Sequence, residues 1–178
     1  DQYTRPGPDL FIGELGIRGR HPFDVLGEAI FMMGMERNGD LNPMMADRPL
    51  LRNWDFVEGH GNPLFFHTNS KSFKTYNFYM SKLFRDNKID MLYGSKNLAG
   101  NNEEEINENY LFSSAGFDSE TNEVVIKIVN LQENKVSTML QIGNKKELVK
   151  AEITTLNSDG KVKNTPQRPN AEVPNIKS

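Results

Sequence analysis

The chain has 178 residues, which allows one large domain or two small ones, and charged residues make up 25% of it. Its formal net charge is -3 and its basic residues are scattered rather than gathered in a stripe, which argues against nucleic acid as the main ligand. It contains no cysteine, which excludes disulfides and a cysteine nucleophile, and no apolar run approaches the roughly 20 residues of a membrane span.

A short apolar run near the start of the chain ends in a carboxylate. Residues 10–12 (LFI) are too few for a helix before the following glycine, so they predict a buried strand. Glu14 would lie at the carboxyl end of this strand, the edge at which parallel α/β folds carry their chemistry. From its position alone, Glu14 is either catalytic or a structural carboxylate that caps the next helix or pairs with Arg18 or Arg20.

An amphipathic helix is predicted over residues 23–37. Pro22 suits its first turn, where the missing N–H costs nothing, and Asp24 complements the positive end of the helix dipole. Gly39 would end the helix. The apolar residues recur with the helical period and give a face wide enough to lie on a sheet: Val25, Leu26, Ala29, Ile30, Met32 and Met33.

Two glycines and a group of methionines stand out in this region. Gly27 and Gly34 predict a close approach of the helix to a strand or a neighbouring helix, which must outweigh a helix-propensity cost of about 1 kcal/mol each. The methionines are interpreted as core filler rather than as a soft-metal site: Met32, Met33, Met35, Met44 and Met45.

A second buried strand is predicted through residues 41–46, directly before Asp47 and Arg48. A strand, a helix and a strand in succession form a βαβ unit, which implies a parallel pair and a right-handed crossover. Residues 52–63 contain the only tryptophan, Trp54, and predict a long loop of the kind that is more often functional than not. Ser70 can then cap a second helix that ends near Asp86.

The composition and the hydrophobic pattern of the sequence change after this second helix. Residues 97–109 predict a solvated linker, and the tail at 157–178 predicts a long loop whose returning strand is missing. Between these, repeated hairpins without helices predict an antiparallel β-sandwich. The predicted strands are residues 110–116, 123–130, 135–142 and 148–156.

Carboxylate chemistry is what remains once other catalytic motifs are excluded. The sequence has no nucleophile elbow and no phosphate-binding glycine loop, and its histidines lie far apart, which does not favour a zinc or iron site: His21, His60 and His67. A carboxylate at a strand end and a loop whose Trp54 can stack on a sugar suit glycoside hydrolysis, which ordinarily needs two carboxylates. Asp47 is the nearest candidate for the second, although Arg48 could neutralise it.

Four stretches of the chain, in order, resemble the α-L-arabinofuranosidases of glycoside hydrolase family 51. Residues 27–40 (GEAIFMMGMERNGD) resemble the helix that follows the strand bearing that family's nucleophile, and ERNGD is the most specific part. Residues 11–14 (FIGE) resemble the strand itself, and residues 44–51 resemble the next strand. Residues 74–84 (KTYNFYMSKLF) resemble the last barrel helix, after which the family passes into a β-sandwich.

The resemblance implies a retaining glycosidase. Residues 1–88 would hold the last two β/α units of a (β/α)8 TIM barrel, and residues 89–178 an incomplete, jelly-roll-like antiparallel β-sandwich. Glu14 would be the nucleophile, with its acid/base partner upstream of Asp1. Asp47, Arg48 and Trp54 would bind substrate, and the reaction would need no metal or organic cofactor.

The sequence also departs from the family pattern. Leu15 stands where the family usually has Tyr, and residues 46–48 (ADR) replace a common Ser-Tyr-Ala. An aromatic wall and a sugar-facing position therefore differ, which leaves the sugar specificity open.

The implied function is the release of terminal α-L-arabinofuranosyl groups from plant cell-wall polysaccharides. Expected partners are an arabinose-containing oligo- or polysaccharide and the missing N-terminal part of the protein; a homo-oligomer is left open. Because the chain starts at Asp1, without an initiator Met or a signal peptide, we expect a mature product or a truncated chain. Without the general acid it should be inactive alone. A secreted or periplasmic location is favoured over a cytoplasmic one. The alternative is a non-catalytic carbohydrate-binding or structural β-sandwich module in which Glu14 is structural.

Overall fold

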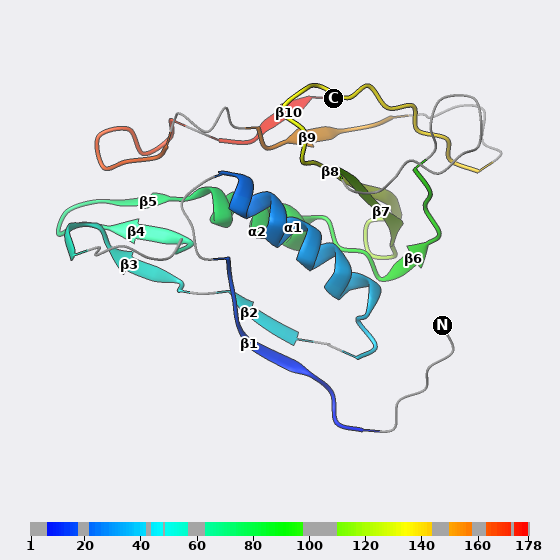
Figure 1. Ribbon diagram of the computed structural model, residues 1–178, viewed down its shortest axis with the longest axis horizontal. Coiled ribbons are helices and arrows are strands. Elements are labelled where there is room, and N and C mark those ends of the chain that lie inside the picture. The colour runs from blue at the N-terminus through cyan, green and yellow to red at the C-terminus, as the bar shows by residue number, and fades with distance from the viewer. Residues whose placement is uncertain are drawn as a thin grey trace.

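The structure is a computed structural model that describes residues 7–17, 22–41, 44–47, 49–56, 63–97, 110–143, 150–157, 163–171 and 173–177. In these residues two helices are surrounded by several small sheets (Figure 1). The fold is therefore α/β with several sheets, and no described helix is long and apolar enough to cross a membrane. Arg18, Arg20, His21, Arg48 and His60 lie outside the described residues.

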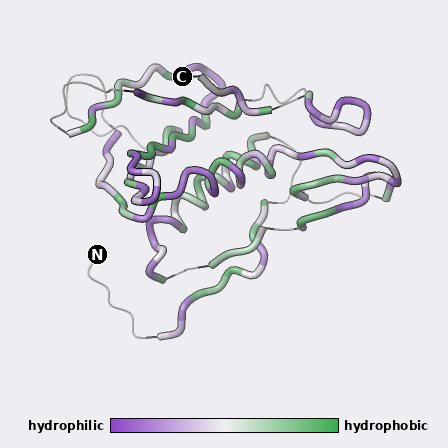
Figure 2. The backbone as a smooth tube through the Cα atoms, turned by 180° about the vertical axis from the view of Figure 1, so that it is seen from behind, coloured by the Kyte–Doolittle hydropathy of each residue, from purple (hydrophilic) through white to green (hydrophobic). Residues whose placement is uncertain are grey.

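The first sheet is a parallel pair. β1 (Phe11–Leu15) and β2 (Met44–Asp47) are joined by helix α1 (Pro22–Arg37), with Phe11 opposite Met44 and Leu15 opposite Asp47. This confirms the predicted strand, helix and parallel strand. The predicted burial is wrong, because Phe11 is 55% exposed and Met44 59% exposed. Among the described residues each strand pairs only with the other, and hydrophobic residues run along both at the rim of the molecule (Figure 2).

Helix α1 begins and ends where its sequence predicts. Pro22 is its first residue, Asp24 lies in its first turn and Arg37 in its last. The predicted close approach is confirmed at Gly27, where an added Cβ would lie 2.8 Å from Cδ1 of Ile17. It is wrong at Gly34, where a Cβ would meet nothing within 4 Å.

A three-stranded sheet follows, in the order β3 (Leu51–Asn53), β4 (Phe65–His67) and β5 (Ser72–Lys74). β3 is parallel to β4, and β4 is antiparallel to β5. The region predicted as one long loop therefore starts with a strand, followed by a 3₁₀ turn η1 (Trp54–Phe56).

The second helix, α2 (Tyr76–Asp86), ends where predicted but starts later. Ser70 is not its cap, because the residues after it form β5, whose Phe73 pairs with Phe66 and is buried. Thr75 caps the helix instead, and its Oγ1 accepts the N–H of Phe78 at 3.4 Å. Phe73 lies three residues before Tyr76, so the helical period of apolar residues extended over it although it belongs to the β4–β5 hairpin.

The third sheet is antiparallel, with β7 (Leu111–Asp118) between β6 (Met91–Tyr93) and β8 (Glu123–Asn130). The hairpin of β7 and β8 confirms two predicted strands. Its turn uses Asn122 at φ 60 and an Asp118 carboxylate that accepts the N–H of Glu120 at 2.9 Å. β6 was not predicted.

The last strands correct two predictions. A strand was predicted over residues 135–142, but the described residues 131–143 contain none. Met139 in this stretch is 92% exposed. β9 (Ile153–Thr155) pairs antiparallel with β10 (Asn175–Lys177), so the tail that was predicted to lack a returning strand provides one.

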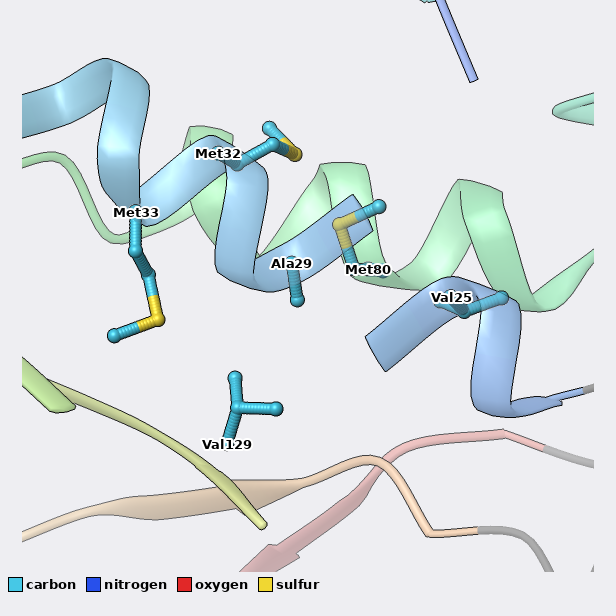
Figure 3. Close-up of a cluster of buried hydrophobic side chains, with 6 residues drawn as sticks. All are labelled: Val25, Ala29, Met32, Met33, Met80 and Val129. Carbon is cyan, nitrogen blue, oxygen red and sulfur yellow. The ribbon is translucent and has the colours of Figure 1, made fainter. Parts of the chain in front are cut away.

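The hydrophobic core joins the helices to the later strands. Its buried members are shown in Figure 3: Val25, Ala29, Met32, Met33, Met80 and Val129. Leu15 and Met45 pack against this cluster from the β1–β2 pair, and Phe112 packs against it from β7. Met32 and Met33 are core residues, as predicted, and α1 lies between two sheets (Figure 1). The division at residue 88 stays a prediction.

Candidate functional site

Glu14 lies at the carboxyl end of β1, directly before the residue that pairs with β2. Leu15 packs against the helical core, and the pairing of β1 with β2 shifts register between Ile12 and Leu15, so the strand is irregular at Glu14. The side chain of Glu14 is exposed. Because Leu15 is opposite Asp47 in the parallel pair, the backbones of Glu14 and Asp47 are neighbours at the same edge. The structure thus brings together the two strand ends that the sequence singled out.

The structure describes the three candidate substrate-binding residues to different extents. The side chain of Asp47 and all of Arg48 lie outside the described residues. Trp54 begins η1, and its ring packs edge-on against Phe66 and Phe73, with ring centroids 5.0 Å and 5.3 Å away. It is half-buried in this aromatic cluster. Substrate binding by these three residues stays a prediction.

Glu28 is the functional candidate that sequence reasoning missed. It is 4% exposed on α1, where Oε1 accepts the N–H of Ile17 at 2.6 Å and Oε2 accepts a hydrogen bond from Nδ2 of Asn77 at 2.5 Å. It thereby joins α1 to α2 and to Ile17, three residues after Glu14. Its position on the helix between the buried Val25 and Met32 was the available signal, because a carboxylate on a buried face requires donors.

Glu36, further along α1, is a second partly buried carboxylate. It pairs with Lys127 of β8, and the Nζ of Lys127 lies 4.5 Å from the ring centroid of Phe84. Burial raises the pKa of Glu36, and the hydrogen bond and charge of Lys127 oppose that rise. Burial likewise lowers the pKa of Lys127 against the opposing effect of Glu36. This pair fastens α1 to the antiparallel sheet, away from Glu14.

The described residues hold no group of three or more His, Cys, Asp or Glu that could bind a metal ion. An open groove of about 570 Å³ lies between α1, α2 and the start of β2, lined in part by Met35, Met44 and Arg85. Because Met44 is the first residue of β2, this groove opens at the edge opposite to Glu14. Glu14 therefore does not line this groove.

The chain is similar to a known family along most of its length. Residues 20–178 match the family model described as "Alpha-L-arabinofuranosidase C-terminal domain". An extracellular exo-α-L-arabinofuranosidase of Streptomyces chartreusis is 38% identical over 96 residues, which are 54% of this chain and 12% of that protein. The chain thus spans a small part of this curated relative.

Solved structures show the same fold. An arabinose-bound family 51 α-L-arabinofuranosidase, MgGH51, superposes with a TM-score of 0.64 at 22% identity and covers 93% of this chain and 25% of its own. The arabinose complex of an α-L-arabinofuranosidase from Thermotoga maritima gives a TM-score of 0.58 at 16% identity and covers 88% and 33%.

Proposed function

Because the chain belongs to the family of α-L-arabinofuranosidase C-terminal domains, matched over residues 20–178, we propose that it completes a retaining glycosidase. In the complete protein this enzyme would release terminal α-L-arabinofuranosyl groups from plant cell-wall polysaccharides. The observation that carries the proposal is the position of Glu14, exposed at the carboxyl end of a strand whose parallel neighbour ends beside it.

The proposed architecture places β1, α1, β2 and α2 in the last two β/α units of a (β/α)8 barrel, followed from residue 89 by an antiparallel β-sandwich. The parallel pairing of β1 with β2 supports this arrangement. The exposure of Phe11 and Met44 supports it too, because barrel strands are covered on both sides. Further strands of the complete protein would pair with the free edges.

In the proposed mechanism the Glu14 carboxylate attacks the anomeric carbon and forms a glycosyl-enzyme ester. A carboxylic acid from another segment of the complete protein protonates the leaving oxygen, and in retaining enzymes the two carboxyl groups lie about 5 to 5.5 Å apart. The resulting carboxylate then takes a proton from water, whose oxygen displaces Glu14. Two inversions at the anomeric carbon give net retention.

The proposed substrate contacts are Asp47, Arg48 and Trp54. Asp47 ends β2 beside the backbone of Glu14, Arg48 is the next residue in the sequence, and Trp54 begins η1 after β3. The reaction as written uses no metal or organic cofactor. Secretion is supported by the S. chartreusis relative, which is described as extracellular.

The nucleophile assignment is tested with Glu14→Ala in the complete protein. Hydrolysis of an aryl α-L-arabinofuranoside should fall by about 10³-fold or more, because the covalent route is lost. Azide should restore turnover by replacing the carboxylate and should release an arabinofuranosyl azide of inverted configuration.

The matched control is Glu123→Ala, which changes an exposed carboxylate at the start of β8 and should leave turnover unchanged. Preserved activity in Glu14→Ala would overturn the assignment. The alternative of a binding or structural module would then be favoured.

A further inference from the structure

Ile17, which follows the Glu14 strand, contacts two consecutive residues of α1, Gly27 and Glu28. The side chain of Ile17 lies against Gly27, where a Cβ would come within 2.8 Å of its Cδ1. The backbone N–H of Ile17 donates to Oε1 of Glu28 at 2.6 Å. Ile17 is therefore held by both its side chain and its backbone, and Glu14 is only a short length of chain away.

The second oxygen of Glu28 is also used. Asn77 of α2 is 4% exposed and its Nδ2 donates to Oε2 of Glu28 at 2.5 Å. Ile17 and Asn77 thus both approach the carboxylate with N–H donors. A side chain with two acceptor oxygens satisfies both of them, whereas an amide at residue 28 would point one NH₂ group at a donor.

We propose that Glu28, held by Asn77, is a positioning residue that fixes the direction in which β1 presents Glu14. This inference rests on the proposed role of Glu14 as the nucleophile. Neither Glu28 nor Asn77 needs to touch the substrate. They act by holding residues 16–17, and so the end of β1, against the two helices; small displacements of a reacting group reduce rates strongly.

The first test is Glu28→Gln in the complete protein, assayed with an aryl α-L-arabinofuranoside. We expect kcat per folded molecule to fall about tenfold while KM changes less than about twofold, because the nucleophile is misplaced but the sugar contacts remain. Glu36→Gln is the matched control. It makes the same substitution on the same helix, at a residue that pairs with β8, and should keep the wild-type kcat.

The second test restores the hydrogen bonds with donor and acceptor exchanged. In the double variant Glu28→Gln with Asn77→Asp, the oxygen of the introduced glutamine can accept from Ile17, and its NH₂ can donate to the introduced aspartate carboxylate. We expect kcat to return to within about threefold of wild type. A purely structural role predicts a lower Tm with an unchanged kcat per folded molecule. That result, or an equal loss of kcat in Glu36→Gln, would overturn the proposal.

Asn77→Ala covers the case in which Glu28→Gln does not fold. It keeps the bond to Ile17 but removes the second donor, so hydrogen exchange at the Ile17 amide should accelerate and kcat should fall. Unchanged exchange or unchanged kcat would contradict the proposal. If Glu14→Ala shows azide rescue while Glu28→Gln keeps wild-type kcat, only the positioning role fails; if Glu14→Ala stays active, the proposed function fails and the positioning role with it.

Discussion

Helix α1 carries two carboxylates that the protein buries in different ways. Glu28 accepts hydrogen bonds from two uncharged N–H groups and links the helix to residues 16–17 and to α2. Glu36 pairs with the charged Lys127, and its Oε2 is buried without a hydrogen-bond partner in the part of the chain that the structure describes. Glu28 therefore contacts the segment that follows Glu14, whereas Glu36 contacts the antiparallel sheet at β8.

The difference follows from what each carboxylate faces. A backbone N–H and a side-chain amide have fixed positions, so Glu28 defines a geometry. A lysine ammonium is a point charge on a flexible stem, so Lys127 neutralises Glu36 without fixing its orientation as tightly. We therefore expect changes at Glu28 to appear in catalysis and changes at Glu36 to appear in stability.

The largest stability effect is expected for Lys127→Met. The side chains of Lys127 and Glu36 are 10% and 21% exposed, so the variant leaves a largely buried carboxylate without its counter-ion. The free energy of opening of α1 and β8 should fall by about 3 kcal/mol. Amide hydrogen exchange of these elements in the complete protein measures this change.

Two further variants show whether the loss comes from the orphaned charge. Glu36→Met with Lys127→Met removes both charges and should recover most of the stability, since apolar replacement of a buried pair is often neutral or better. Asn77→Ala removes an uncharged partner of Glu28 and should cost less, about 2 kcal/mol. Equal losses in Lys127→Met and in the double variant would mean that packing around the lysine stem, not the ion pair, matters.

A smaller effect separates the two glycines of α1. Gly34→Ala should stabilise the helix by about 1 kcal/mol, because alanine is the better helix former and a Cβ there meets nothing within 4 Å. Gly27→Ala gains the same propensity but must displace Cδ1 of Ile17, so its gain should be smaller or absent. The Tm values of the two variants measure the difference. An equal rise in both would show that Ile17 moves at no cost, and it would weaken the inferred hold of α1 on residues 16–17.

The smallest effect is a pH dependence at Glu36. Burial raises the pKa of Glu36 above its ordinary value of 4.5, so the folded state binds the proton more tightly than the unfolded state. The stability that this contributes is complete below pH 4.5 and is lost as pH rises through the folded pKa. The stability of wild type relative to Glu36→Gln should therefore increase as pH falls from 7 to 4.5. A difference that stays constant over this range would contradict the raised pKa.

The sequence by itself determined the elements whose signals are local. Pro22, Asp24 and the apolar period located α1, and the turn between β7 and β8 located that hairpin. The strand ending at Glu14 and its parallel partner were also predicted, because a strand, a helix and a strand in succession leave few topologies. These features bring Glu14 and Asp47 to one edge, which is the part of the candidate site that sequence reasoning reached.

Only the tertiary structure decided what depends on partners distant in the chain. Thr75 rather than Ser70 caps α2 because residues 72–74 join a sheet in which β4 pairs with the earlier strand β3. The tail forms a strand because β9 lies beside it. Glu28 becomes part of the candidate site only when Ile17 and Asn77 converge on it. The physical reason is the same each time: burial and hydrogen bonding depend on the whole assembled surroundings of a residue, whereas a local pattern records only its neighbours in the chain.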